Sequence, residues 1–399
     1  MSAEVKPSSP ATRAALSFVL TVGVLSFFSD FTHESARSIL GPYLGTLGLG
    51  AFAIGAITGF GQFVNYAFRL VSGRFADRTR AYWPIAIFGY VVQMLAVPAL
   101  ALTHHWIPAA ILMVLERLGR SIRNPARDAM LSHAAEQIGF GWAFGVHEAL
   151  DQLGATIGPL TIAALMAYRS DYRLAFGCLL IPAIINLSLV LLARHFYPHP
   201  EILGNKETAR VTGSTAYPSA FRLYLLAGVL VAAGFADYPI IAYHFQRIGS
   251  VAPDLIPVFY AVAMGVGGAG SLALGRLFDR FGFPLLIALT LVTAAYAPLV
   301  FAGGTWTALA GSVLWGIGMG VHESIIPAAV SPMVTASRRA SAYGLFTSIY
   351  GLAWFVGSAL IGLVYEQSVT SAVIFCVAAE LAAIPLLMAT ARAARRDHI

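Results

Sequence analysis

Long runs of apolar residues, separated by short polar stretches, fill most of this chain. Most runs have about 20 residues, the length that an α-helix needs to cross a hydrocarbon layer of ~30 Å, and the first is longer than that. The runs span residues 14–44, 51–71, 83–102, 107–130, 142–168, 174–192, 223–244, 255–274, 285–302, 306–329, 342–364 and 372–391. The pattern predicts about twelve transmembrane helices.

Composition supports an all-α, polytopic membrane protein. Hydrophobic residues make up 58% of the 399 positions and charged residues only 11%, against about 25% charged residues in soluble domains. The net charge of +6 is not interpreted as a nucleic-acid footprint, because the basic residues gather in the loops of one side. The protein is therefore expected in the cell membrane, with lipids around it, no nucleic-acid partner and both termini cytoplasmic.

One polar stretch, residues 193–220, is longer than any other break between runs. We interpret it as a cytoplasmic linker between two halves. The predicted organisation is a tail at 1–13, a six-helix bundle at 14–192, the linker at 193–220, a second six-helix bundle at 221–391 and a tail at 392–399.

The two halves repeat each other with an offset of about 200 residues. Phe28–Phe31 (FSDF) corresponds to Phe235–Tyr238 (FADY), and Gly73–Arg78 (GRFADR) corresponds to Gly275–Arg280 (GRLFDR). Parallel repeats of this kind are typical of transporters that bind substrate between their halves, near the bilayer midplane. The repeats predict two pseudo-symmetric bundles.

The first apolar run carries ionisable residues where lipid would exclude them. Asp30, Glu34 and Arg37 are spaced i, i+4 and i+7, so they share one helix face, and His33 lies beside Glu34. Such groups cost at least ~2.5 kcal/mol each at membrane depth unless they face a cavity or a partner. This face is a predicted functional site, and Asp30 and Glu34 are the first candidates for proton coupling.

The fourth run is rich in arginine. Glu116 is i, i+4 from Arg120, and Arg123 is i, i+3 from Arg120, which predicts one basic, internally paired helix face in a run that also contains Arg117. The face either holds an anionic group of a substrate or balances the carboxylates of the first run. Arg127 is expected to reach the membrane interface by extending its side chain.

The fifth run carries His147, Glu148 and Asp151. The two acids either neutralise the arginines of the fourth run or form a proton path; the sequence favours neither. Gly154 and Gly158 form a small-xxx-small pattern that predicts close helix packing, next to Pro159.

The second half supplies fewer polar groups. The seventh run contains Asp237, Tyr238 and His244, and Pro239 is expected to break its helix. The tenth run contains His322, which titrates in the physiological range, beside Glu323. Trp315 and Tyr343 lie deeper in their runs, as candidates for lining a cavity or packing in the core.

At this point the sequence resembles the major facilitator superfamily. The resemblance is carried by the twelve-span plan, the central linker and the loop motif Gly-x-x-x-Asp-Arg, present as GRFADRTR and GRLFDRFG. Gly154–Pro159 (GATIGP) is similar to part of the motif of the drug:proton antiporter branch, although Leu160 and Thr161 replace the glycines expected next.

The resemblance implies two bundles that rock about a central cavity, lined mainly by the first, fourth, seventh and tenth spans. It also implies that the Gly-x-x-x-Asp-Arg loop is a cytoplasmic latch in the outward-facing state. The residues expected in the two latches are Gly73, Arg74, Asp77, Arg78, Gly275, Asp279 and Arg280.

We therefore predict a monomeric secondary active transporter that exports a small polar or amphiphilic molecule by proton-coupled alternating access. No motif for ATP hydrolysis or covalent catalysis is found, so neither enzyme activity nor a cofactor is expected. The predicted coupling and cavity residues are Asp30, Glu34, Arg37, Arg120, Arg123, Glu148, Asp151, Asp237, His322 and Glu323. The substrate-binding candidates are His33, Arg117, His147, Tyr238, His244, Trp315 and Tyr343.

Two alternatives remain open from the sequence. The first is a divalent-metal exporter with ligands drawn from Asp30, His33, Asp237, His244 and His322. Against it, neighbouring residues such as His33 and Glu34 are not expected to point at one place on a regular helix. The second is a membrane protein that binds or senses a ligand without transporting it.

Overall fold

The computed structural model describes residues 10–199, 217–326, 329–330, 333–334 and 339–396. The elements of its first half are α1 (Pro10–Thr46), α2 (Ala51–Thr79), α3 (Tyr82–Ala99) with the 3₁₀ turn η1 (Leu100–Leu102), α4 (Trp106–Ile138), α5 (Phe140–Tyr168), α6 (Tyr172–Cys178) and α7 (Leu180–Phe196). The elements of its second half are α8 (Ser219–Gly234), α9 (Tyr238–Ile248), α10 (Leu255–Phe281), α11 (Phe283–Thr293), α12 (Tyr296–Ala302), α13 (Thr305–Gly320) with the π-helical turn η3 (Val321–Ile325), α15 (Arg339–Gln367) and α16 (Val369–Arg396).

These helices present apolar side chains to the outside of the molecule. Phe60, Phe88, Ile181 and Ile374 are among the large hydrophobic residues that stay exposed. In a bilayer such residues face lipid, and the helix satisfies its backbone hydrogen bonds internally. The outer surface is thus the reverse of that of a soluble protein, which confirms the membrane class predicted from composition.

Among the described residues, eight helical segments are long and apolar enough to cross a membrane, and a ninth is added if α10, bent by 41°, counts as one span. The predicted total of twelve also requires α2, α4 and α13. Helices α2 and α4 carry several arginines, and α13 ends after 16 residues where η3 begins. The count of twelve stays a prediction.

Some predicted boundaries differ from the structure. Helix α1 begins at Pro10, so the last residues of the predicted 1–13 tail are helical, whereas residues 200–216 of the predicted linker and the last three residues of the chain lie outside the described residues. The seventh run is divided between α8 and α9. The break precedes Pro239: Asp237 accepts a hydrogen bond from the backbone N–H of Tyr238 and caps α9.

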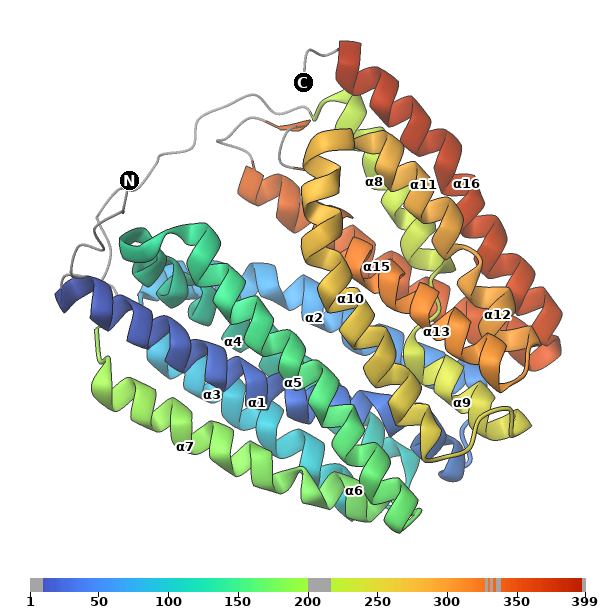
Figure 1. Ribbon diagram of the computed structural model, residues 1–399, viewed down its shortest axis with the longest axis horizontal. Helices are drawn as coiled ribbons and strands as arrows, with labels where there is room; N and C mark the ends of the chain where they lie inside the picture. Colours follow the sequence, from blue (N-terminus) through green and yellow to red (C-terminus); the bar gives the residue numbers. More distant parts are fainter. Residues whose placement is uncertain (1–9, 200–216, 327–328, 331–332, 335–338, 397–399) are drawn as a thin grey trace, which may run out of the picture.

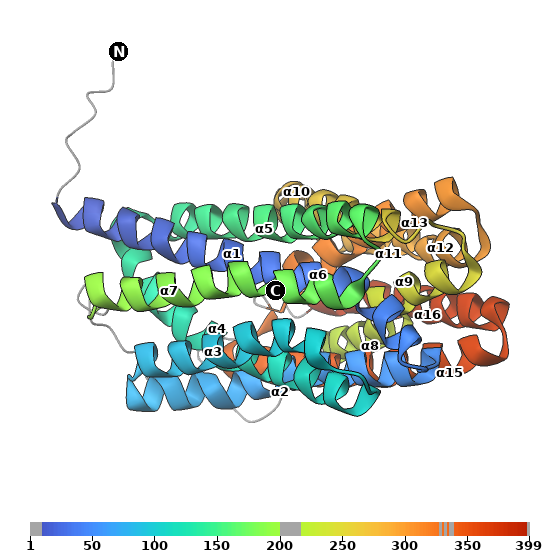
Figure 2. The same cartoon turned by 90° about the horizontal axis from the view of Figure 1, so that it is seen from below.

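The helices form two groups, α1–α7 and α8–α16, which Figures 1 and 2 show in blue to green and in yellow to red. Two seams join the groups: α2 packs along α15, and α5 packs along α10. Helix α1 also packs against α9.

The groups meet most closely at the end of the molecule that is far from the termini. A Cβ atom added at Gly41 of α1 would overlap the carbonyl oxygen of Pro239, and one at Gly55 of α2 would overlap that of Ser358. Gln246 donates a hydrogen bond across the same end to the hydroxyl of Tyr172. This end of the molecule is therefore closed.

Candidate functional site

A cavity of about 780 Å³ lies between the two groups of helices. Its lining comes from the middle of α1, from the middle and the termini-side parts of α2, α4, α5, α10 and α15, and from the end of α13 with η3. The cavity thus extends toward the end where the termini lie, opposite the closed end. Its walls are unusually charged for a membrane protein.

The charged face of α1 forms the deep part of this cavity. Asp30, Glu34 and Arg37 all line it, and each is less than 9% exposed. Helical spacing places the three side chains on one side, as the i, i+4, i+7 pattern predicts. The energetic cost of burying them is offset by ion pairs with other helices.

Arg120 of α4 supplies the nearest counter-charge. Its guanidinium lies 3.1 Å from Asp30 and 3.9 Å from Glu34. Of the two uses considered for the basic face of α4, balancing the carboxylates of the first span is therefore present in the structure. Glu116, expected to pair with Arg120, pairs with Arg117 and His33 instead.

Arg123 does not line the cavity. It is fully buried and donates hydrogen bonds to Gln93, Tyr90 and Ser29, with Asp30 at 3.7 Å. Its guanidinium also lies over the Tyr90 ring, 4.7 Å from the centroid. The side chain thus links α4 to α3 and α1 from behind the cavity wall.

Arg127 does not extend to the membrane interface as expected. It is buried, forms a 2.8 Å ion pair with Asp128 and donates a hydrogen bond to Ser26. A neighbouring carboxylate and a hydroxyl on α1 satisfy the guanidinium at the wall of the cavity, which Arg127 lines.

Two contacts cross between the groups at the deep end of the cavity. Arg37 donates a 2.6 Å hydrogen bond to Asp237, which is 0% exposed and sits at the break between α8 and α9. The hydroxyl of Tyr260 on α10 donates to the carboxylate of Glu34. Arg37 itself lies 3.7 Å from Glu34. One short chain of charged contacts therefore joins the two halves.

His33 lies in a second set of contacts on α1 and α4. Its Nδ1 is 2.9 Å from Glu116, and its Nε2 is 2.9 Å from Arg117. A guanidinium can only donate, so Nε2 accepts and the ring proton sits on Nδ1, facing Glu116. His33 and Glu34 approach to 3.6 Å, so the expectation that they diverge was wrong: long side chains on adjacent positions can bend toward one another.

The α5 acids do not neutralise the α4 arginines by direct ion pairs. Glu148 accepts a hydrogen bond from Gln152, and Asp151 has no ion-pair partner among the described residues, although both line the cavity. The arginines are balanced by Asp30, Glu34, Glu116 and Asp128 instead. His147 lines the cavity and shares a 2.7 Å hydrogen bond with Ser26.

In the second half, His322 and Glu323 lie in the π-helical turn η3 and line the cavity. Such turns are frequent at functional sites because they shift the register of the side chains. His322 shares a 2.8 Å hydrogen bond with the hydroxyl of Tyr350. Tyr343 lines the cavity as well.

Three substrate-binding candidates are core residues. Tyr238 and Trp315 are 0% exposed and bond to backbone carbonyls of Ile256 and Ala236. His244 is bonded to Tyr365 at the closed end, away from the cavity. The polar side-chain atoms of these three residues bond to partners within the second half. The sequence pattern does not reveal these partners.

The ligands proposed for the metal alternative are dispersed. Asp237 contacts Arg37, His244 contacts Tyr365 and His322 contacts Tyr350. In the described part of the chain, no three His, Cys, Asp or Glu side chains are grouped as a metal ion requires. Nothing in the geometry of these residues favours metal export.

The latch residues lie at the ends of α2 and α10, toward the termini. Arg74, Asp77, Arg78, Asp279 and Arg280 are exposed. Asp77 has no ion-pair or hydrogen-bond partner within the described ranges. Gly73 lies close to Pro125 of α4, and Gly275 faces open space.

The glycines of α5 lie against α1. A Cβ atom at Gly154 would overlap the carbonyl oxygen of Phe27, and one at Gly158 would be 2.5 Å from that of Phe31. Only glycine permits this approach. Pro159 follows within the same helix.

Several cavity residues were missed in the sequence. Gln62, Asn65 and Arg69 of α2 line the cavity at i, i+3 and i+7, so one polar face in an apolar run was the available signal. Tyr260, which bonds to Glu34 without lining the cavity, gave no signal, because an aromatic residue in such a run usually packs in the core. Further missed residues of the lining are Tyr66, Asn124, Asp128, Gln152 and Tyr350.

Comparisons with known proteins agree with this architecture. The sequence model of the Major Facilitator Superfamily matches residues 21–358. The chain is 37% identical over 390 residues to the uncharacterized protein Rv2265 of Mycobacterium tuberculosis, a match that covers 95% of each chain. It is 25% identical over 358 residues to the uncharacterized MFS-type transporter MJ1317 of Methanocaldococcus jannaschii, covering 88% of this chain and 89% of that one.

Among solved structures, the nucleoside transporter NupG is similar with a TM-score of 0.73 and 15% identity. The likeness covers 94% of this chain and 98% of NupG. At this identity it shows the fold, while the family match extends over most of the chain. This protein belongs to the Major Facilitator Superfamily, a family of multi-pass membrane transporters and not of enzymes.

Proposed function

We propose that this transporter couples the movement of a small polar or amphiphilic molecule to protons by alternating access. The contact between Arg37 and Asp237 is the observation that carries the proposal. It joins the two halves at the closed end of the cavity, and both of its side chains are buried. A gate that depends on buried charges responds to a change of a single charge.

Protonation would open this gate in a simple way. A proton on Asp237 or on Glu34 removes one negative charge and leaves Arg37, which is only 4% exposed, with less compensation. A buried arginine that loses a partner is strongly unfavourable, so the halves separate and water reaches the guanidinium. With both carboxylates charged, the ion pairs hold the end closed.

The same groups also face the substrate space. Glu34 and Arg37 line the cavity, and Arg120 lies within 4 Å of both Asp30 and Glu34. A polar substrate that contacts these residues competes with the proton for the carboxylates. Antiport results when the proton and the substrate occupy these carboxylates alternately and not together. The partial GATIGP motif supports export as the direction.

Distance measurements at the closed end test this mechanism without knowledge of the substrate. Spin labels are placed on His105→Cys and Thr307→Cys, two exposed positions at the starts of α4 and α13, in a chain in which Cys178 and Cys376 are replaced by alanine. We expect a longer distance at pH 5 than at pH 8 in the otherwise unaltered protein. Asp237→Asn, which keeps the cap on α9, is expected to give the longer distance at both pH values.

Asp128→Asn is the matched control, since Asp128 pairs with its neighbour Arg127 within α4. It should retain the response of the parent. A distance that ignores pH in the parent, and is unchanged by Asp237→Asn, would overturn the proposed gate. Proton release on addition of candidate solutes to the purified protein, compared with Asp30→Asn and Glu34→Gln, then tests antiport itself.

A further inference from the structure

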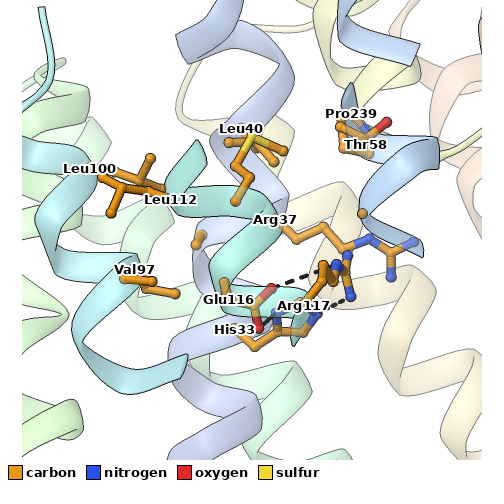
Figure 3. Close-up of a pocket in the computed structure, with 14 residues that line it drawn as sticks. His33, Arg37, Leu40, Thr58, Val97, Leu100, Leu112, Glu116, Arg117 and Pro239 are labelled. Carbon is orange, nitrogen blue, oxygen red and sulfur yellow. Dashed lines mark hydrogen bonds and ion pairs between the residues drawn. The ribbon is translucent and has the colours of Figure 1, made fainter. Parts of the chain in front are cut away.

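A second, smaller pocket lies between α1, α2, α3 and α4 of the first group, with Pro239 of α9 also lining it (Figure 3). Its volume of about 30 Å³ is at least twice the ~10–15 Å³ that one water molecule needs. It shares His33, Arg37 and Arg117 with the large cavity, so these side chains stand where the two spaces meet. The proposed function makes no use of it.

One end of the pocket is apolar. Leu40, Val97, Leu100 and Leu112 surround it in Figure 3. Met113, whose thioether side chain is flexible, also lines the pocket. Apolar walls do not stabilise a bound water molecule, because each water needs two or more hydrogen-bond partners. A hydrocarbon group is the better occupant of this end.

The other end holds two polar atoms without partners. The hydroxyl of Thr58 and the Nε of Arg37 are buried and make no hydrogen bond to any described residue, and both residues line the pocket. Thr58 is 3% exposed and Arg37 is 4% exposed. Unsatisfied buried groups are costly, so a ligand oxygen that accepts from them is strongly favoured.

The charges at this end are already matched. Arg37 faces Asp237 and Glu34, and Arg117 faces Glu116. A carboxylate entering the pocket would add an anion beside Glu116, where each of these arginines already has its counter-charge. An uncharged oxygen leaves the balance intact and still accepts from Nε and from the hydroxyl.

We infer that this pocket binds a short uncharged group of the transported molecule, with a branched hydrocarbon end and a hydroxyl or carbonyl oxygen directed at Thr58 and Arg37. The inference rests on the proposed function only in assigning the group to the substrate. The polar remainder of that molecule would lie in the large cavity, beyond Arg117.

Thiol labelling measures whether the pocket admits such a group. Val97→Cys and Met94→Cys are compared in the full-length protein with both native cysteines replaced by alanine. Both positions are buried on α3, but only Val97 lines the pocket. Methyl methanethiosulfonate, a small uncharged reagent, is expected to modify Val97→Cys at least about tenfold faster than Met94→Cys.

Acetone and acetate then separate the ligand classes, since they have the same shape and differ in charge. Acetone should slow the labelling of Val97→Cys at least about twofold at half occupancy, and acetate should not. Thr58→Val, which keeps the shape and removes the hydroxyl, should weaken the protection by acetone.

Equal labelling of the two cysteines, or no labelling of Val97→Cys, would reduce the pocket to a space for water and overturn the inference. Equal protection by acetate would overturn the assignment to an uncharged group. Neither readout depends on protons or on transport, so this inference and the proposed gate can fail independently.

Discussion

Arg37 of α1 donates a hydrogen bond of 2.6 Å to Asp237, a residue 200 positions later in the opposite half of the transporter. Asp237 also caps α9, so one carboxylate both begins a helix and joins the two halves. A short, charge-assisted contact of this kind is strong when water is excluded. It links the local break in the seventh span to the closure of one end of the molecule.

A double-mutant cycle on this pair should show strong coupling. Arg37→Gln alone leaves Asp237 buried without its cation, with an expected loss of about 3–5 kcal/mol in the free energy of unfolding. The double variant Arg37→Gln, Asp237→Asn removes both charges, keeps the cap and should recover most of that loss. Chemical unfolding in detergent measures the cycle; strictly additive losses would contradict the pairing.

Arg123→Lys should lower stability more than it alters transport per folded molecule. The guanidinium of Arg123 reaches Gln93, Tyr90 and Ser29 from one fully buried position, and a lysine cannot match that fork. We expect a loss of about 2–4 kcal/mol. Arg120→Lys, at the cavity wall, is the comparison.

Arg120→Lys should impair transport with a smaller loss of stability, because Arg120 is more exposed than Arg123 and faces the cavity. Unfolding and transport are measured on the same preparations. If Arg123→Lys abolished transport in a fully stable protein, Arg123 would have the coupling role predicted from sequence.

Gly154→Ala should weaken the packing of α5 on α1. The added Cβ would overlap a backbone oxygen of α1, which cannot rotate away as a side chain would. We expect a loss of about 1–3 kcal/mol, seen as a lower melting temperature in detergent.

Gly145→Ala on the same helix is the control. No atom of the described residues lies within 4 Å of a Cβ at this position, so alanine should be neutral or stabilising by up to about 1 kcal/mol. Equal effects of the two substitutions would show that Gly154 does not set the distance between the helices.

Asp77→Asn should slow transport without lowering stability in the state described. Asp77 is exposed and has no partner within the described ranges, so this state loses nothing when its charge is removed. The state with the other end open is expected to use Asp77 to close the cytoplasmic side. We predict an unchanged melting temperature and a turnover at least about tenfold lower, equivalent to about 1.4 kcal/mol.

Vesicle transport assays and thermal unfolding check that prediction together. Asp279→Asn, at the corresponding position at the end of α10, tests whether both latch segments have this role. Unchanged turnover in Asp77→Asn would remove the latch from the mechanism.

The charged face of α1 shows how far the sequence alone could go. Periodicity placed Asp30, Glu34 and Arg37 on one side of a helix, and the cost of burying charge required partners for them. It could not say which partners. Glu116 was expected to pair with Arg120 because the two are i, i+4 on α4, yet it pairs with His33 of α1 and with Arg117. Contacts between helices compete with i, i+4 pairs, and packing decides the outcome.

The sequence by itself determined that the chain is a helical membrane protein of two repeated halves with charge buried in the first span. These properties follow from hydropathy, periodicity and internal repetition, which are local or additive along the chain. Only the tertiary structure decided that Arg37 joins Asp237, that Tyr260 reaches Glu34, that Arg123 lies behind the cavity wall and that a small pocket opens beside Arg117. Those relationships depend on the distances and rotations between helices, which no pattern along a single helix encodes.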